Sequence, residues 1–222
     1  MKFISLFEVI GPNMIGPSSS HTAGAVAIGR MAGRLFQKEV CRVTFVLYGS
    51  FARTYRGHGT DRALLGGVMG YDMDDVRIRD AFAEAEKSGI AYAYETDEDA
   101  AGLHPNTADV CLEAKDGTKL TVRGESVGGG KIRITRIDGV DLDFTGEYAT
   151  LIIEHLDTPG VIAYFTAALA MKGINIAFMR VFRKEQRQTA YAIIESDEEI
   201  PVEVVAHLHL HTEISKVILV QG

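Results

Sequence analysis

Residues 149–183, ATLIIEHLDTPGVIAYFTAALAMKGINIAFMRVFR, decide the fold of the C-terminal half. An apolar strand-like run is followed by a short turn, an apolar helix-length run and a second strand. Beyond residue 183 the same alternation continues. The expected strands are Ala149–His155, Ile174–Arg183, Thr189–Glu195 and Ile214–Val220, and the expected helices are Val161–Met171 and Val202–Leu208. This βαββαβ order predicts a ferredoxin-like arrangement.

The turns of this half support the same prediction. Thr158 is a candidate N-cap for the first helix, because its hydroxyl can accept from an unpaired helical N–H. Lys172-Gly173 is typical of a left-handed helix end. The charged stretch 183–187 indicates a solvated hairpin.

The segments LDTPGV (156–161) and GINI (173–176), together with this order, resemble the ACT domain family. The resemblance implies a homodimer that pairs through the sheets or helices of this domain, and a small amino acid bound near the first loop. It assigns Asp157, Gly160 and Asn175 to a regulatory pocket. In the alternative interpretation, Pro159-Gly160 is only a tight turn and Asn175 only the entry to a strand, because fold alone does not imply function.

The N-terminal half, residues 1–145, is glycine-rich and predicts a separate α+β domain before an ACT domain at 148–222. Small residues between Ala23 and Phe36 predict a helix that packs closely against a neighbour. The other expected helices are Asp61–Met69 and Arg77–Lys87, and the expected strands are Val40–Tyr48, Ala91–Glu95, Ala108–Ala114, Lys119–Val127 and Lys131–Ile137. Asp116-Gly117 predicts a two-residue hairpin turn between Ala108–Ala114 and Lys119–Val127.

Hydroxyls and an imidazole gather before the first expected helix, in GPSSSHT (16–22). A helix N-terminus has unpaired N–H groups and a partial positive charge, so it favours a carboxylate. One serine would suffice as a cap. The excess predicts a binding role for Ser18, Ser19, Ser20, His21 and Thr22.

A second motif, GHGTD (57–61), places His58 between two glycines. Flanking glycines let a ligand approach the backbone and the imidazole closely. Histidine titrates near neutral pH and can take a proton from carbon if it is aimed at one. The alternative is a merely solvated loop histidine.

A third, weaker signal is the loop GLHPNT (102–107), where Pro105 stiffens the presentation of His104 and Asn106. Their donors and acceptors could bind a carboxylate or an amine. By contrast, no carboxylate-rich shell accompanies His207, His209 and His211, and their spacing lets at most His207 and His211 share a helix face. We interpret these three as surface or packing residues and not as a zinc site.

The segments SLFEVIGPNMIGPSSSHTAGA and YGSFARTYRGHGTDRAL, the GLHPNT loop and a terminal ACT domain together resemble the β subunit of the bacterial iron–sulfur-dependent L-serine dehydratase. The resemblance spans nearly the whole chain. It implies deamination of L-serine to pyruvate and ammonia without pyridoxal phosphate, on a [4Fe-4S] cluster held by a separate α subunit. It also implies that His58 is the base, and that the substrate is bound by Ser18, Ser19, Ser20, His21, Thr22, Gly59, Thr60, Asp61, His104 and Asn106.

The residues of this chain are compatible with a reaction in which one subunit supplies the base and another holds the metal cluster. Dehydration of serine needs a base for the α-proton and a Lewis acid that helps hydroxide to leave. The chain has candidate bases, but its two cysteines, Cys41 and Cys111, stand far apart and form no CxxC or Cys/His cluster. We therefore expect no metal site in this chain and no activity from the chain alone.

Two other functions stay open. A non-catalytic amino-acid sensor with an ACT dimer would need carboxylate and amine clamps but no aimed imidazole. A detached regulatory region of a phosphoglycerate dehydrogenase is a further alternative, since the N-terminal module also resembles the allosteric substrate-binding domain of some of those enzymes. No GxGxxG opens a βαβ unit here, so a nucleotide-binding domain is not predicted.

The composition limits the remaining classes. The net charge of -7 does not predict a nucleic-acid-binding face, which needs clustered Lys and Arg. No apolar run approaches the about 20 residues that cross a bilayer. The opening MKFISLFEVIGPN, with Glu8, is too short in its apolar part for a signal peptide, so a cytoplasmic location is expected.

Overall fold

The computed structural model describes residues 13–221 with the exception of 147 and 184, so most of the opening segment and the motif SLFEVIGP lie outside the described residues. The chain divides into two compact units, Met1–Gly139 and Val140–Gly222. The sequence predicts the division a few residues later, at 145–148. No helix among the described residues is long and apolar enough to cross a membrane.

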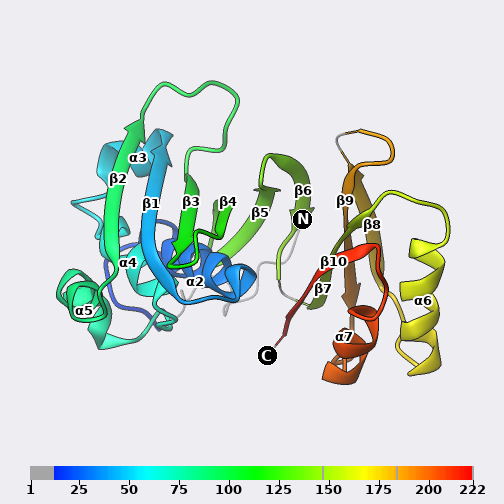
Figure 1. The fold of residues 1–222 in the computed structure, drawn as a ribbon. Helices are drawn as coiled ribbons and strands as arrows, with labels where there is room; N and C mark the ends of the chain where they lie inside the picture. The colour runs from blue at the N-terminus through cyan, green and yellow to red at the C-terminus, as the bar shows by residue number, and fades with distance from the viewer. Residues whose placement is uncertain (1–12, 147, 184, 222) are drawn as a thin grey trace, which may run out of the picture. The chain divides into compact units, whose positions relative to one another are not determined.

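A mixed sheet has the strand order β2-β1-β3-β4-β5-β6, drawn side by side in Figure 1; β1 to β5 belong to the first unit, and β6 begins at the boundary residue Val140. Strands β1 and β2 are parallel, while β1–β3, β3–β4 and β4–β5 are antiparallel. The strands are β1 (Val40–Tyr48), β2 (Ala91–Asp97), β3 (Thr107–Ala114), β4 (Lys119–Gly128), β5 (Lys131–Ile137) and β6 (Val140–Phe144). The helical elements are η1 (Ser19–Ala23), α2 (Gly24–Phe36), α3 (Gly49–Thr54), α4 (Thr60–Val68), η2 (Val76–Asp80) and α5 (Ala81–Lys87).

Helices α2 and α4 pack against each other with their backbones in close approach, as the small residues of 23–36 predict. A Cβ on Gly29 would lie 2.2 Å from the carbonyl oxygen of Leu64, and a Cβ on Gly67 would lie 2.2 Å from that of Val26. Only glycine fits at such a crossing. The crossing fixes the start of α4, and therefore the loop before it, relative to the start of α2.

Several predicted elements of this unit need correction. The expected helix 77–87 is a 3-10 turn followed by a shorter α5, because Asp75 accepts from the N–H of Arg77 and caps the turn instead of a long helix. The sequence patterns did not predict α3, a six-residue helix, or β6, a five-residue strand at the edge of the same sheet. Both are short, so their periodicity is too weak to read. The hairpin at Asp116-Gly117 is present, but its loop is one residue longer than predicted: the N–H of Ala114 donates to Thr118 across residues 115–117, and of these Gly117, at φ +83°, is left-handed.

The second unit has a four-stranded sheet of order β10-β7-β9-β8, whose neighbours are all antiparallel. Its elements are β7 (Ala149–Leu156), α6 (Val161–Met171), β8 (Phe178–Arg183), β9 (Thr189–Ser196), α7 (Val202–Leu208) and β10 (Ile214–Val220). The chain order βαββαβ and this strand order confirm the predicted ferredoxin-like fold.

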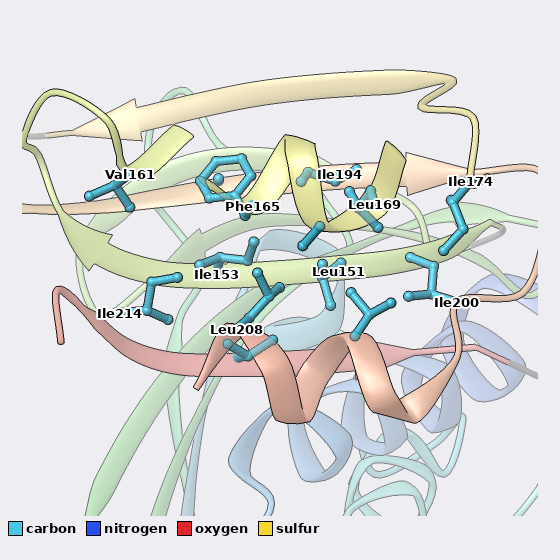
Figure 2. Close-up of a cluster of buried hydrophobic side chains, with 14 residues drawn as sticks. Leu151, Ile153, Val161, Phe165, Leu169, Ile174, Ile194, Ile200, Leu208 and Ile214 are labelled. Atoms are coloured by element: carbon cyan, nitrogen blue, oxygen red, sulfur yellow. The ribbon is translucent and has the colours of Figure 1, made fainter. Parts of the chain in front are cut away.

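The core of the second unit lies between its sheet and its two helices. Figure 2 shows Leu151 and Ile153 of β7 and Ile194 of β9 on one side of this core. Phe165 of α6 and Leu208 of α7 face them, and all five side chains are fully buried. Burial of each such side chain stabilises the fold by about 1.5–3 kcal/mol.

Helix α6 ends in a Schellman motif, which explains one wrong prediction. Gly173 has φ +70°, its N–H donates to Ala170, and the N–H of Ile174 donates to Leu169. Ile174 then packs into the core beside Leu169. Since residues 174–177 close the helix and re-enter the core, β8 begins at Phe178 and not at Ile174 as predicted.

Candidate active site

The motif GPSSSHT forms a capped entrance to the first helical segment. The hydroxyl of Ser18 accepts from the N–H of His21 at 3.2 Å, and the carbonyl of Ser18 accepts from Thr22 at 2.8 Å. The next five residues, Ser19–Ala23, form a π-type turn that continues into α2. Such turns often occur at functional sites, because they push a side chain out of the regular helical register.

The side chain of His21 is held from both ring nitrogens. Its Nε2 lies 2.9 Å from Oγ of Ser50, and its Nδ1 lies 3.1 Å from Oγ of Ser20 and 3.3 Å from Oγ of Ser18. Burial, and secondarily the charge of His58, lower the pKa of His21. The neutral imidazole is therefore favoured at neutral pH, and its orientation is fixed by three hydroxyls.

The loop GHGTD brings His58 against His21. The two rings meet edge to face with 4.7 Å between their centroids. The hydroxyl of Thr22 donates to the carbonyl of His58 at 3.0 Å, so the two motifs are also joined through the backbone. Gly59 adopts φ +67°, a left-handed conformation that favours glycine. Among the described residues, Nδ1 of His58 is buried and has no hydrogen-bond partner.

The two residues after Gly59 are buried at the start of α4. The hydroxyl of Thr60 also lacks a partner within the described part of the chain. Asp61 accepts from the N–H of Arg62 at 2.8 Å, and its backbone carbonyl accepts from the hydroxyl of Tyr94 at 2.7 Å. Burial raises the pKa of Asp61 above its ordinary value, and burial also raises the pKa of Tyr94.

The loop HPN reaches the same region through Ser50. The carbonyl of Pro105 accepts from the N–H of Ser50 at 2.7 Å, and the hydroxyl of Ser50 bonds His21. His104 is turned inward on its own loop, because its Nδ1 accepts from the N–H of Asn106 at 3.2 Å. The side-chain oxygen of Asn106 is buried without a partner among the described residues. All three predicted motifs therefore converge, with Ser50 as the link.

A cavity of about 330 Å³ opens beside His58, while His21 is not among the described residues that line it. His58, its two flanking glycines and Thr22 line it. The cavity also exposes residues that the sequence analysis missed, namely Arg62 and Arg79. Arg62 directly follows GHGTD, so its position beside the motif was a readable signal, whereas nothing in the sequence places Arg79 there. Ser50, the second residue of α3, was also not predicted, although it lies two residues after the end of β1.

The predicted regulatory residues of the second unit do not come together within one chain. Asp157 and Gly160 precede α6, whereas Asn175 follows it. A helix of 11 residues separates its ends by about 16 Å. Asp157 is already occupied: Arg183 donates to its carboxylate at 2.6 Å and holds its pKa below the usual range. Asn175 is exposed.

The histidines near the end of the chain pack locally, and only two of them touch a neighbouring ring. His207 stacks on Tyr164 with 5.3 Å between centroids, and His211 contacts the same ring at 4.5 Å. His209 caps α7 and is exposed.

The described cysteines do not suit an iron–sulfur cluster. Cys41 and Cys111 lie on neighbouring strands, where Cys111 pairs with Thr44, three residues away from Cys41. Burial raises the pKa of the Cys111 thiol, which disfavours the thiolate that a metal requires. Among the described residues, no group of three or more His, Cys, Asp or Glu side chains could hold a metal ion. The residues present therefore do not fit a cluster.

The fold and the site define a two-part chain: an α+β domain with two interacting histidines beside a cavity, joined to an ACT domain. The family model for the serine dehydratase beta chain matches residues 3–136, and the ACT domain model matches residues 149–209. The chain belongs to the serine dehydratase beta chain family.

Individual relatives agree over almost the full length. The probable L-serine dehydratase, beta chain, of Bacillus subtilis (strain 168) is 45% identical over 208 residues, 94% of each chain. The L-serine dehydratase, beta chain, of Peptoniphilus asaccharolyticus is 38% identical over 200 residues, 90% of each chain. A D-3-phosphoglycerate dehydrogenase of Bacillus subtilis is 28% identical over 185 residues, 82% of this chain but only 34% of that enzyme.

Proposed function

We propose that this chain is the substrate-binding and base-supplying β subunit of a cytoplasmic L-serine dehydratase. The observation that carries the proposal is the meeting of His21 and His58, from two separate motifs, beside an open cavity. The beta-chain relatives and the family match support it.

In the proposed reaction, the imidazole of His58 takes the α-proton of L-serine while hydroxide leaves the β-carbon, so that a carbon–carbon double bond forms. The resulting aminoacrylate hydrolyses to pyruvate and ammonia. A histidine can act in this way only as the neutral base. Nδ1 of His58 makes no hydrogen bond among the described residues, which leaves its lone pair or its proton available.

His21 is proposed to orient His58 and the substrate. Its lowered pKa keeps it neutral, so it adds no positive charge beside the base. Its three hydroxyl contacts fix the ring that His58 touches. The serines and Thr22 are proposed to shape the pocket and to bind the polar groups of the substrate, together with Gly59, Thr60, Asp61, His104 and Asn106.

Since the residues present do not fit a cluster, we propose that a [4Fe-4S] cluster belongs to a separate α subunit and that pyridoxal phosphate is not used. The cluster would supply the Lewis acid for the leaving hydroxide. The names of the beta-chain relatives support the existence of such a partner chain.

We also propose that the ACT domain makes the chain a homodimer through the edge strand β8. Phe178, Met179 and Val181 of this strand are 54%, 40% and 37% exposed. An exposed apolar edge strand is a template for pairing with another chain. A proline at Val181 would remove one backbone donor and is expected to yield monomers in sedimentation experiments.

The decisive experiment combines the purified chain with an iron–sulfur α subunit under anaerobic conditions and measures pyruvate from L-serine. We expect pyruvate only from the combined chains. Dehydration by this chain alone, without iron, would refute the proposal. Serine binding with no turnover in the complex would instead favour the amino-acid sensor.

A further inference from the structure

The electrostatics of the cavity beside His58 are one-sided. Among the described residues, its lining includes two arginines, Arg62 from the first turn of α4 and Arg79 from η2, and no aspartate or glutamate. The side chains of Ile15, Pro17 and Ile78 form the apolar part of its wall. A small pocket with an apolar wall and a few charged groups is the usual form of a site for a small charged molecule.

Neither arginine forms an ion pair with a carboxylate within the described part of the chain. Other arginines do: Arg123 binds Asp109 and Arg77 binds Asp75, each through two nitrogens. The guanidinium of Arg62 instead lies over the ring of Phe82, 5.5 Å from its centroid. Asp61, its neighbour in sequence, accepts from the backbone N–H of Arg62 and not from the guanidinium.

The glycines on either side of His58 leave room at the wall of the same cavity. A Cβ on Gly59 would meet nothing within 4 Å, and a Cβ on Gly57 would meet only a carbonyl oxygen at 3.7 Å. A planar guanidinium binds a carboxylate through two parallel hydrogen bonds. The cavity therefore offers two guanidinium groups that can each bind a carboxylate, and the glycines leave open space for the rest of the ligand.

We propose that Arg62 and Arg79 bind the carboxylate of the substrate. This inference rests on the proposed function for the identity of the substrate as L-serine. The α-carbon of serine carries both the carboxylate and the proton to be removed. A carboxylate held by these arginines therefore places the α-proton at the wall of the cavity that His58 forms.

The test titrates the full chain by calorimetry with three probes: L-serine, propionate, which keeps only the carboxylate, and ethanolamine, which lacks it. We expect serine and, more weakly, propionate to bind, and ethanolamine not to bind. Arg62→Met and Arg79→Met should each weaken serine and propionate binding about tenfold or more. The affinities of Arg62→Lys and Arg79→Lys should lie between those of the native chain and of the Met variants, because lysine keeps the charge but lacks the planar guanidinium.

Two further readouts separate a binding role from a structural one. The Nε nitrogen resonances of Arg62 and Arg79 should shift when propionate is added. Arg42→Met, which removes an exposed arginine of β1 outside the cavity, should change nothing. In the complex with the α subunit, the Met variants should raise KM for serine more than they lower kcat.

The two proposals fail in different ways. Carboxylate binding that depends on both arginines, with no turnover in the complex, would leave this inference intact and refute the enzymatic function. Turnover with an unchanged KM in the Met variants would refute the inference alone. If neither the chain alone nor the complex bound a carboxylate, the inference that Arg62 and Arg79 bind the substrate would also be refuted.

Discussion

The first loops of the two units differ in how their polar groups are satisfied. In the second unit, Asp157 accepts from Arg183 and from the N–H of Arg187, and the hydroxyl of Thr158 donates to Glu213. In the first unit, Nδ1 of His58 and the hydroxyl of Thr60 are buried without partners among the described residues.

Leaving a buried polar atom unpaired costs about 1–3 kcal/mol, so groups of them need an explanation. In the first unit, an unpaired atom belongs to a histidine that lines a cavity, which a ligand would satisfy. The second unit also has such an atom, Nε2 of His155, but this ring packs against Phe165 inside the core. The difference indicates that the first unit is built to bind, and that the loop of the second unit is closed by its own chain.

The largest expected effect tests the first unit. His58→Ala should lower turnover of L-serine by the two-chain complex by about 10²–10⁴-fold, because a general base contributes on that order. His209→Ala, which removes an exposed histidine of the second unit, is the matched control and should keep full activity. Initial rates of pyruvate formation measure both variants. Full activity of the His58→Ala complex would remove this residue from the role of base.

The next effect concerns the core of the second unit. Phe165→Ala should lower the free energy of unfolding of this unit by about 3–5 kcal/mol, because Phe165 is fully buried. Val202→Ala, at a side chain of α7 that is 69% exposed, should have a far smaller effect. The melting temperatures of the two variants, measured by calorimetry, distinguish the two effects. Carboxylate binding by the first unit should persist while the second unit is destabilised, and its parallel loss would contradict the separation drawn above.

Filling the cavity should have an intermediate effect. Gly57 does not adopt a left-handed φ, so Gly57→Ala adds a methyl group to the cavity wall without backbone strain. Serine affinity should fall about tenfold, and the melting temperature should stay the same. Gly124→Ala is the contrast: its Cβ would lie 2.7 Å from Cγ2 of Ile28, so this variant should lose stability instead. Unchanged affinity in Gly57→Ala would place the ligand elsewhere.

Much of the fold could be predicted because its signals are local. Long periodic runs predicted α2, β1 and the six elements from β7 to β10, and Gly173 marked the end of α6. The errors lie where a tertiary contact overrides the local pattern. Ile174 reads as the start of a strand, but it turns into the core to close a helix.

The composition of the site was less predictable than its motifs. Residues 16–22 and 57–61 stood out because hydroxyls, imidazoles and glycines exceed what capping and turns need. Their contact depends on the crossing of α2 and α4, which no local pattern gives. Arg79 reaches the cavity from a 3-10 turn that was expected to be helix, so its role could be read only from the three-dimensional arrangement.

The smallest effect tests the electrostatics of His21. Its folded-state pKa is lowered by burial and by His58, so the unfolded chain takes up a proton at this position more readily than the folded chain does. This contribution to stability is present above the ordinary histidine pKa of about 6.5 and is lost as the pH falls below it. The melting temperature of the native chain should therefore fall more steeply between pH 7 and pH 5 than that of His21→Gln. Equal slopes in the two proteins would mean that folding does not lower the pKa of His21, and the proposal that this ring is kept neutral beside His58 would then fail.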